Sequence, residues 1–258
     1  MTMNRIDKLF AQKKGNILSV FFTAGYPAFE DTLPILELLE KYGADMVEIG
    51  IPFSDPVADG PTIQQASSIA LEQGMTLEKL LGQLANMRTK ISIPVILMGY
   101  LNPILQFGID KFLERCRETG IDGLIIPDFP PEEFEKGFAE KFLDNGISYI
   151  PLAAPSTSAQ RFKLVDKAST GFIYVVSSPG VTGGEGQFSE TTMSYFKKLG
   201  EAKPVRPMLV GFGIHNANTF EQACEYTSGA IVGSAFIRAL EKGGSLEEKI
   251  SGFMKKFR

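Results

Sequence analysis

The sequence has few of the residues on which several classes of protein depend. Its two cysteines, Cys116 and Cys224, lie far apart and lack the spacing of a metal site, so we expect reduced thiols and a cytoplasmic protein. His215 is the only histidine, which argues against a Ser-His-Asp triad. We expect it at a helix start or in support of the residues that contact the ligand. No apolar run approaches the ~18 residues of a membrane span, and the N-terminus lacks the apolar core of a signal peptide.

Positive charge is scarce as well. The formal net charge is −4, which gives no general attraction for nucleic acid or for anionic membranes. A phosphate group would therefore have to be bound locally, by backbone amides or by a few side chains. None of the apolar, strand-like segments carries a lysine, so Schiff-base chemistry on a carbonyl substrate is not supported.

What the chain does have is a regular alternation. Hydrophobic residues make up 44% and charged residues 22% of it, as in globular proteins, and eight short apolar segments alternate with segments of helical periodicity. We expect strands at residues 17–23, 46–49, 94–100, 123–127, 147–152, 172–176, 207–210 and 230–232. No linker or change of composition divides the chain, so residues 1–258 are predicted to form a single domain.

Caps and apolar spacing mark the helices. Asn4 and Ser158 are typical N-caps, Ser245 and Glu248 form a capping box, and Pro61 suits a first helical turn. Further helices are expected at residues 77–89, 109–119 and 134–142. Near-continuous apolar strands indicate a parallel sheet. The predicted fold is α/β, a (β/α)8 TIM barrel with an extra N-terminal helix and additional helices after strands 2 and 8; an open doubly wound sheet is the alternative.

An acid lies inside the second predicted strand. Glu48 is flanked by Met46, Val47 and Ile49, and a charge in a buried strand is unfavourable unless it is paired, neutralised or functional. One interpretation is a structural acid paired with a lysine or arginine of the barrel. The other is an acid/base group whose pKa is raised by apolar surroundings. We expect those surroundings to be Val47, Ile49, Ile51 and Phe53.

The loop after this strand carries Asp55 and Asp59. In a barrel the loops that follow the strands build the face that holds the active site. Two acids four residues apart are compatible with a divalent-metal site, but no histidine cluster or third acid stands at metal spacing. We therefore predict no metal site.

Glycines follow each of the last three predicted strands, at residues 180–186, 211–213 and 233. Glycine lets the backbone approach a ligand closely, and amides at a helix start bind anions. The glycines of any one loop could simply end a strand. Three such loops after adjacent strands favour a shared phosphate site.

The run of residues 47–64, Val-Glu-Ile-Gly-Ile-Pro-Phe-Ser-Asp-Pro-Val-Ala-Asp-Gly-Pro-Thr-Ile-Gln, resembles the signature of the tryptophan synthase α-subunit family. Residues 21–27, 100–102, 180–183, 211–214 and 233–235 also match, in order. The resemblance covers essentially the whole chain. It implies a (β/α)8 barrel and a lyase of tryptophan biosynthesis that cleaves indole-3-glycerol phosphate to indole and D-glyceraldehyde 3-phosphate by a retro-aldol reaction.

The resemblance also implies roles for particular residues. Glu48 would move the protons, and Asp59 would face the indole N–H. Thr182 would position Asp59 when a mobile loop closes. Phe21 and Tyr100 would surround the indole, and Tyr174 would line the site. With Thr182, these are the expected substrate-binding residues. The expected phosphate-binding residues are Gly183, Gly213, Gly233 and Ser234.

The family works with a partner. The resemblance implies a tryptophan synthase β subunit in an α2β2 heterotetramer, which holds the pyridoxal phosphate, so no cofactor is expected in this chain. The β subunit would meet residues 55–59, residues 103–107 and the loop near residue 180. Ser178 and Pro179 depart from some family members, which have a basic residue there, and this bears on how the loop orders.

Two other functions are compatible with parts of the pattern. A phosphate-binding barrel that acts mainly as a regulatory or tunnel subunit would need neither Glu48 nor Asp59, so their presence favours the lyase. An indole-glycerol-phosphate synthase would need a catalytic lysine at a strand end, and the apolar strands carry none.

Overall fold

The protein is described by a computed structural model that covers residues 4–177 and 186–257. Within these residues all the strands are parallel and belong to one sheet. The strands are β1 (Ile17–Thr23), β2 (Met46–Gly50), β3 (Val95–Met98), β4 (Gly123–Ile125), β5 (Ser148–Tyr149), β6 (Leu152–Ala153), β7 (Ile173–Val176), β8 (Met208–Gly211) and β9 (Gly229–Val232). Their order in the sheet is β5-β4-β3-β2-β1-β9-β8-β7-β6.

The sheet closes into a barrel because its two end strands are pieces of one segment. A single strand was predicted at residues 147–152, and the structure divides it at Ile150 and Pro151, since proline has no N–H to give to a ladder. Ile150 N still donates to Leu124 O of β4 at 3.0 Å, and Pro151 O accepts from Tyr174 N of β7 at 3.0 Å. The eight predicted strands thus form a (β/α)8 barrel, and the open doubly wound alternative is wrong.

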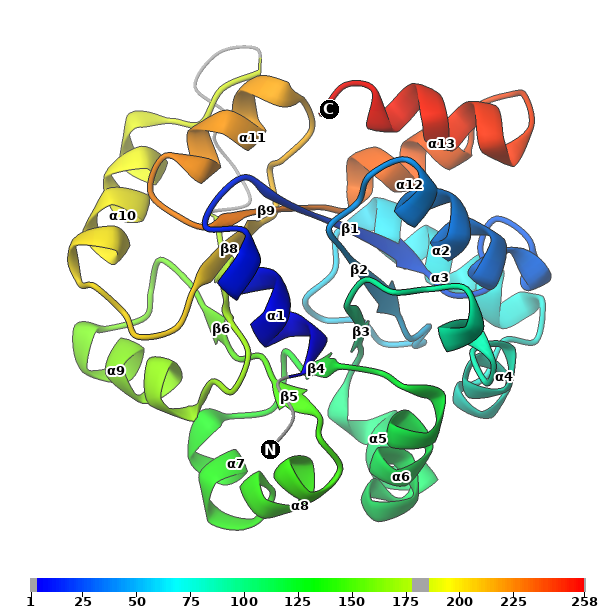
Figure 1. Ribbon diagram of the computed structural model, residues 1–258, viewed down its shortest axis with the longest axis horizontal. Coiled ribbons are helices and arrows are strands. Elements are labelled where there is room, and N and C mark those ends of the chain that lie inside the picture. The colour runs from blue at the N-terminus through cyan, green and yellow to red at the C-terminus, as the bar shows by residue number, and fades with distance from the viewer. Residues whose placement is uncertain (1–3, 178–185, 258) are drawn as a thin grey trace.

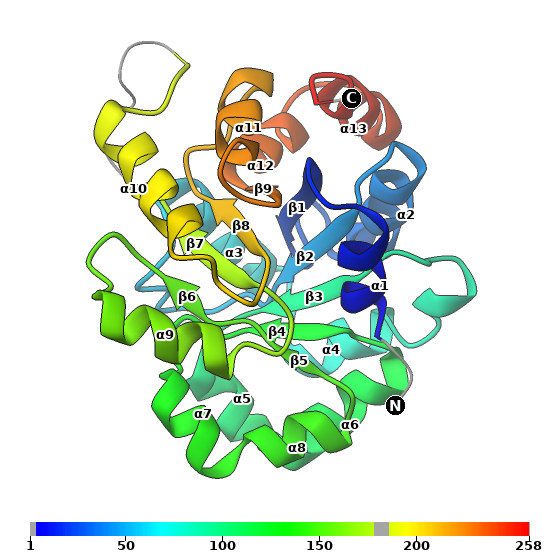
Figure 2. The same ribbon diagram turned by 60° about the vertical axis from the view of Figure 1, so that its left-hand side comes forward.

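Helices surround the barrel (Figures 1 and 2). In the described residues the α-helices are α1 (Arg5–Gln12), α2 (Thr32–Lys41), α3 (Pro61–Glu72), α4 (Leu77–Gln83), α5 (Leu101–Phe107), α6 (Ile109–Thr119), α7 (Pro131–Gly137), α8 (Ala139–Asp144), α9 (Ala159–Ala168), α10 (Glu190–Glu201), α11 (Ala217–Cys224), α12 (Ser234–Leu240) and α13 (Leu246–Met254). Short 3-10 turns cover Phe29–Asp31 and Met87–Thr89. None of these helices is long and apolar enough to span a membrane.

The helical predictions are confirmed where the signal is local. The Asn4 side chain accepts from Asp7 N at 3.0 Å at the start of α1, the extra N-terminal helix. Additional helices follow the second strand (α3 and α4) and the last one (α12 and α13). The helix predicted over residues 77–89 is shorter: α4 ends at Gln83, and Met87–Thr89 is a 3-10 turn.

Two helical features were not predicted. Helix α5 begins directly after Tyr100, and the side chain of Asp128, from a distant loop, accepts from Leu101 N at 2.9 Å. The helix predicted from the phenylalanine spacing is broken at Phe138, where φ is −121° and the ring packs edge-on against Phe129 at 4.9 Å. Both features depend on contacts with residues outside the helix concerned, which helical periodicity does not reveal.

Strand side chains alternate between the barrel interior and the layer of helices. Phe21, Met46, Ile96 and Tyr174 belong to the interior cluster, whereas Val47 belongs to the larger core between strands and helices. Met46 and residue 48 lie on the same side of β2. The side chain of Glu48 therefore enters the barrel.

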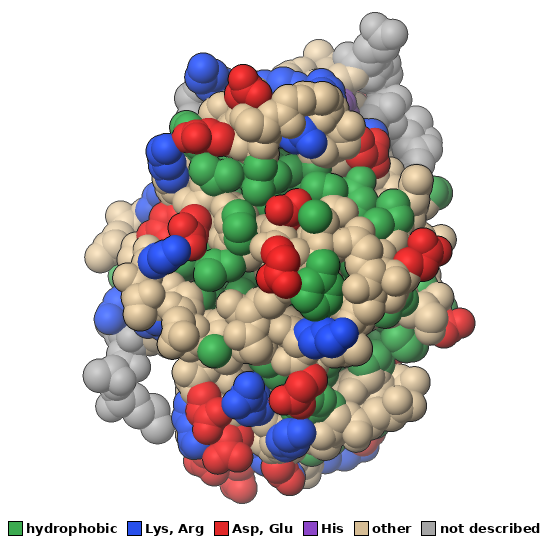
Figure 3. Space-filling model, turned by 90° about the vertical axis from the view of Figure 1, so that its right-hand side faces the viewer, with side chains coloured by type: hydrophobic (Ala, Val, Ile, Leu, Met, Phe, Trp, Pro, Cys, Tyr) green, Lys and Arg blue, Asp and Glu red, His purple; other side chains and the backbone are tan. Residues whose placement is uncertain are grey.

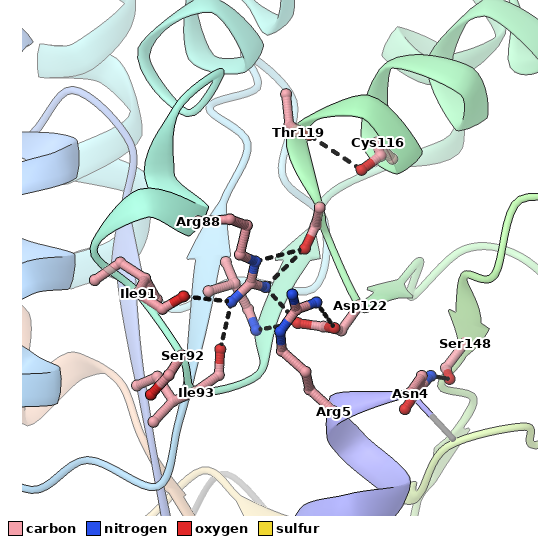
Figure 4. Close-up of polar contacts among 12 residues, drawn as sticks. Asn4, Arg5, Arg88, Ile91, Ser92, Ile93, Cys116, Thr119, Asp122 and Ser148 are labelled. Carbon is pink, nitrogen blue, oxygen red and sulfur yellow. Dashed lines mark hydrogen bonds and ion pairs between the residues drawn. The ribbon is translucent and has the colours of Figure 1, made fainter. Parts of the chain in front are cut away.

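The N-terminal end of the barrel is closed by α1. Ile6 of this helix is completely buried within the interior cluster. Beside it, Asp122 accepts from Arg5 at 3.0 Å, from Arg88 and from Val95 N at 2.9 Å (Figure 4). Arg88 also donates to the carbonyls of residues 93 and 120. One buried carboxylate thus joins α1, the strand β3 and the 3-10 turn at Met87–Thr89.

Replacing this carboxylate tests its structural role. Asp122→Asn should lower the free energy of unfolding by about 3 kcal/mol, because it leaves buried guanidinium charge without a counter-charge. Urea denaturation measures the change. Glu114→Gln is the control: it breaks an ion pair with Arg117 in which both side chains are more than half exposed, and the effect should stay below about 1 kcal/mol. Equal effects for the two variants would contradict the assigned role of Asp122.

Candidate active site

A cavity lies at the carboxyl ends of the strands. Its lining comes from β1, β3, β7 and β9, from the loops after β2, β8 and β9, and from the starts of α3 and α12. The lining residues are Phe21, Asp59, Ile63, Met98, Tyr174, Phe212, Gly213, Ile214, His215, Ile231, Gly233, Ser234, Ala235 and Arg238. Six of the predicted site residues thus meet in one cavity: Phe21, Asp59, Tyr174, Gly213, Gly233 and Ser234. Thr182 and Gly183 lie outside the described residues, as do Ser178 and Pro179.

Glu48 lies inside the barrel and is fully buried. Ser19 Oγ donates to its Oε1 at 2.9 Å, while Oε2 has no hydrogen-bond partner among the described residues. No lysine or arginine of the described chain forms an ion pair with Glu48, so the structural ion-pair interpretation is wrong. Burial raises the pKa of Glu48 from 4.5 to about 8, and the hydrogen bond from Ser19 opposes this only in part.

The surroundings of Glu48 differ from the prediction. Val47, Ile49 and Ile51 belong to the outer core, because neighbouring strand residues point to opposite sides of the sheet. The residues in register with Glu48 are Phe21 on β1 and Ile96 on β3, both in the interior cluster. The predicted rise in pKa is therefore found, but its cause is the barrel interior and not the sequence neighbours.

Tyr174 lines the cavity and is close enough to Glu48 and Asp59 for their charges to affect its pKa. Burial, with smaller contributions from Glu48 and Asp59, raises the pKa of the Tyr174 hydroxyl well above its ordinary value. The phenol is therefore neutral and available as a donor near both acids. Gly211 makes room for it: a Cβ at that position would lie 2.0 Å from Tyr174 Oη.

Asp59 is held in place by Tyr100. The Tyr100 hydroxyl donates to Asp59 Oδ2 at 2.9 Å and accepts from Ala58 N at 2.9 Å, and its ring packs against Phe53. Burial raises the pKa of Asp59, and the hydrogen bond from Tyr100 lowers it. Tyr100 lines a smaller cavity behind Asp59, together with Phe21. It thus positions Asp59 and does not line the main cavity.

The glycine-bearing loops line the other part of the cavity. Gly213 has φ +73°, a conformation that favours glycine, and a Cβ there would lie 2.9 Å from Phe188. Gly233 precedes α12, and Ser234 is the first residue of that helix. Backbone at the ends of two loops and the hydroxyl of Ser234 thus line the same cavity as Asp59.

Two polar residues of the lining were not predicted as ligand contacts. His215 precedes Asn216, the N-cap of α11, as expected for a residue at a helix start. Its Nδ1 donates to Gly213 O at 2.8 Å, and its ring also lines the cavity. Arg238 lines the cavity from α12, four residues after Ser234; that helical spacing is a signal from which it could have been found.

Together these residues combine three chemical capacities. Glu48 has a pKa near neutrality and can both give and take a proton. Asp59 offers a carboxylate oxygen to a donor on an apolar ligand, and the loop glycines offer room for an anion. The described residues contain no group of three or more His, Cys, Asp or Glu side chains arranged to hold a metal ion.

The elevated pKa of Glu48 predicts how stability depends on pH. A carboxyl whose folded pKa lies above its unfolded value stabilises fully below the unfolded value, and that contribution falls as the pH rises through the folded one. Relative to the wild type, Glu48→Gln should therefore gain stability between about pH 5 and about pH 8. Ser19→Ala should extend this pH range upward, because it removes the hydrogen bond that lowers the pKa of Glu48. Parallel urea stability curves for Glu48→Gln and wild type across this range would refute the assignment.

Known sequences identify the family. The family model described as tryptophan synthase alpha chain matches residues 7–256. The tryptophan synthase alpha chain of Christiangramia forsetii is 50% identical over 254 residues, which cover 98% of each chain. That of Flavobacterium psychrophilum is 50% identical over 242 residues, covering 94% of this chain and 95% of the relative.

Solved structures give the same result. Tryptophan synthase subunit alpha from Legionella pneumophila matches with a TM-score of 0.87 at 35% identity, covering 99% of this chain and 97% of that one. A chain of M. tuberculosis tryptophan synthase, in an aminoacrylate-bound form, matches with a TM-score of 0.86 at 27% identity, covering 99% and 98%. By sequence and by fold, the chain belongs to the tryptophan synthase alpha chain family.

Proposed function

We propose that this chain cleaves indole-3-glycerol phosphate to indole and D-glyceraldehyde 3-phosphate, as a carbon–carbon lyase of tryptophan biosynthesis in the cytoplasm. The observation that carries the proposal is the pairing of a buried acid of pKa about 8, Glu48, with a carboxylate on the wall of an apolar cavity, Asp59. Phe21 and Tyr174 line that cavity with aromatic rings, against which the indole ring of the substrate would pack. Gly213, Gly233 and Ser234 lie where the phosphate would bind.

The reaction needs one proton at carbon and the loss of another from oxygen. Glu48 in its acid form protonates C3 of the indole, which gives a positively charged indolenine. The bond between C3 and the glycerol carbon then breaks, its electron pair returns to the ring, and the hydroxyl proton passes to the Glu48 carboxylate as the aldehyde forms. A pKa near the working pH suits a group that both donates and accepts.

Asp59 acts on the other side of the ring. As C3 gains its proton, positive charge develops on the indole nitrogen, and a carboxylate that accepts the N–H stabilises that charge. Tyr100 fixes the orientation of Asp59 through the 2.9 Å hydrogen bond to Oδ2. Thr182, outside the described residues, is proposed to contact Asp59 when its loop closes.

Glu48 does not line the cavity in this structure, so its carboxyl must turn toward the substrate. Among the described residues only one hydrogen bond, from Ser19, holds the carboxyl, and Oε2 has no partner. Turning thus breaks a single hydrogen bond and brings the unpaired oxygen toward a polar ligand. The free energy needed to turn the carboxyl is small, since a typical hydrogen bond contributes about 1 kcal/mol.

We further propose a tryptophan synthase β subunit as partner in an α2β2 heterotetramer, with pyridoxal phosphate on the β subunit only. Val57 is 87% exposed in the loop that carries Asp59, and Leu105 is 50% exposed on α5, just after Tyr100. Both residues lie in the segments that the resemblance assigns to the partner, where an apolar side chain would be covered by the β subunit. On the side of the molecule that carries α2, α3 and α4, hydrophobic side chains lie interspersed with charged ones (Figure 3). Partner contact at residues 55–59 and 103–107 would act directly on the catalytic loop.

The acid/base assignment is tested by conservative substitution. Glu48→Gln should lower the rate of indole release from indole-3-glycerol phosphate by at least about 100-fold, because the amide can neither donate nor accept the proton. Asp59→Asn should also be strongly impaired. Asp55→Asn, in the same loop but away from the cavity, is the control and should retain activity. Near-normal turnover by Glu48→Gln would show that another group moves the protons.

The partner surface is tested separately. Val57→Asp and Leu105→Asp should each weaken binding of a tryptophan synthase β subunit by about tenfold or more, since each puts a charge into an apolar contact. Binding and the activation of indole release by the β subunit are both measured. Val205→Asp is a matched control, because Val205 is also 87% exposed but lies in the loop before β8, at the opposite end of the barrel. Unchanged binding by Val57→Asp and Leu105→Asp, or an equal loss of binding by Val205→Asp, would argue against this interface. Equal turnover with and without the β subunit would argue against activation by the partner.

A further inference from the structure

Arg238 is the only lysine or arginine that lines the main cavity in the described part of the chain. We infer that Arg238 makes the site selective for a phosphorylated substrate by binding the phosphate group with its guanidinium. The inference rests on the proposed function, and extends it to a residue outside the glycine-bearing loops. The chain has a net charge of −4, so the attraction of a phosphate dianion to the cavity depends on a positive charge close by, which Arg238 provides.

The helix geometry directs Arg238 toward the glycine end of the cavity. Arg238 follows Ser234 by four residues on α12, so the two side chains share a helix face. Helical side chains lean toward the N-terminus of their helix, which here begins at Ser234 after Gly233. A phosphate at Gly233 and Ser234 would therefore lie within reach of the guanidinium.

The guanidinium is available to a ligand. It is exposed, and its one hydrogen bond within the described chain is a long contact from Nη1 to Thr62 Oγ1 of 3.4 Å. No carboxylate of the described residues forms an ion pair with it. A planar guanidinium without a carboxylate partner matches the geometry of two phosphate oxygens.

The contact with Thr62 also places Arg238 between the two ends of the site. Thr62 lies in the first turn of α3, three residues after Asp59. The side chain of Arg238 therefore extends from α12, which begins at the proposed phosphate site, to α3, which follows the loop that carries Asp59. An anion bound by Arg238 would sit on the same side of the cavity mouth as the start of α3.

The first test uses binding without turnover. Arg238→Gln should weaken binding of glycerol 3-phosphate, measured by calorimetry, by about tenfold or more, the effect of one hydrogen bond to a charged group. Arg238→Lys should be intermediate, because lysine keeps the charge but not the planar pair of donors. Lys242→Gln, which removes a nearby positive charge outside the cavity, should bind within about twofold of wild type.

The second test separates selectivity from folding. The ratio of kcat/KM for indole-3-glycerol phosphate to that for unphosphorylated indole-3-glycerol should fall by about tenfold or more in Arg238→Gln, whereas a purely structural defect would lower both values alike. Unchanged glycerol 3-phosphate binding and an unchanged ratio would overturn the inference. If wild type binds glycerol 3-phosphate through Arg238 but cleaves neither substrate, the proposed function fails and the phosphate role of Arg238 stands.

Discussion

The burial of the Glu48 carboxyl inside the barrel is the constraint on which the site depends. A carboxylate in an apolar interior is unfavourable, so the group keeps its proton to a pKa of about 8. Ser19 offers one hydrogen bond, and no cation of the described chain neutralises the charge. The energetic disadvantage of this placement is what gives the side chain its chemical use, because a proton held near neutral pH can be given up and recovered.

The two ends of the barrel differ, and this difference keeps Glu48 buried but close to a cavity. At the N-terminal end, α1 buries Ile6 against the interior and the Asp122 network ties the helix to the strands. At the carboxyl end, glycines and loop residues open a cavity above the same interior. A packed N-terminal end and an open carboxyl end follow the usual separation of stability and catalysis in this fold.

The sequence predicted the features that are encoded locally. The β1 bounds and the Asn4 cap followed from periodicity and capping chemistry, and Glu48 was singled out as an acid in an apolar run. The role expected of Asp59 came instead from the resemblance to the family. The division of a strand at Pro151 and the Asp128 cap of α5 were missed, because they depend on which segments become neighbours. The neighbours of Glu48 were assigned to the wrong face because the alternation of side chains along a strand was not applied to them. The hydrogen bond from Tyr100 to Asp59 was not foreseen because it joins segments distant in sequence.

The most direct test of this account is the titration of Glu48 itself. Carbon-13 labelling of glutamate carboxyls, with the Glu48 signal assigned by its loss in Glu48→Gln, gives the protonation state of this group by NMR as the pH is varied. The account predicts a midpoint near pH 8 for the folded chain. A midpoint near the ordinary value of 4.5 would mean that the carboxyl is charged throughout the neutral range, and would contradict its role as the proton donor.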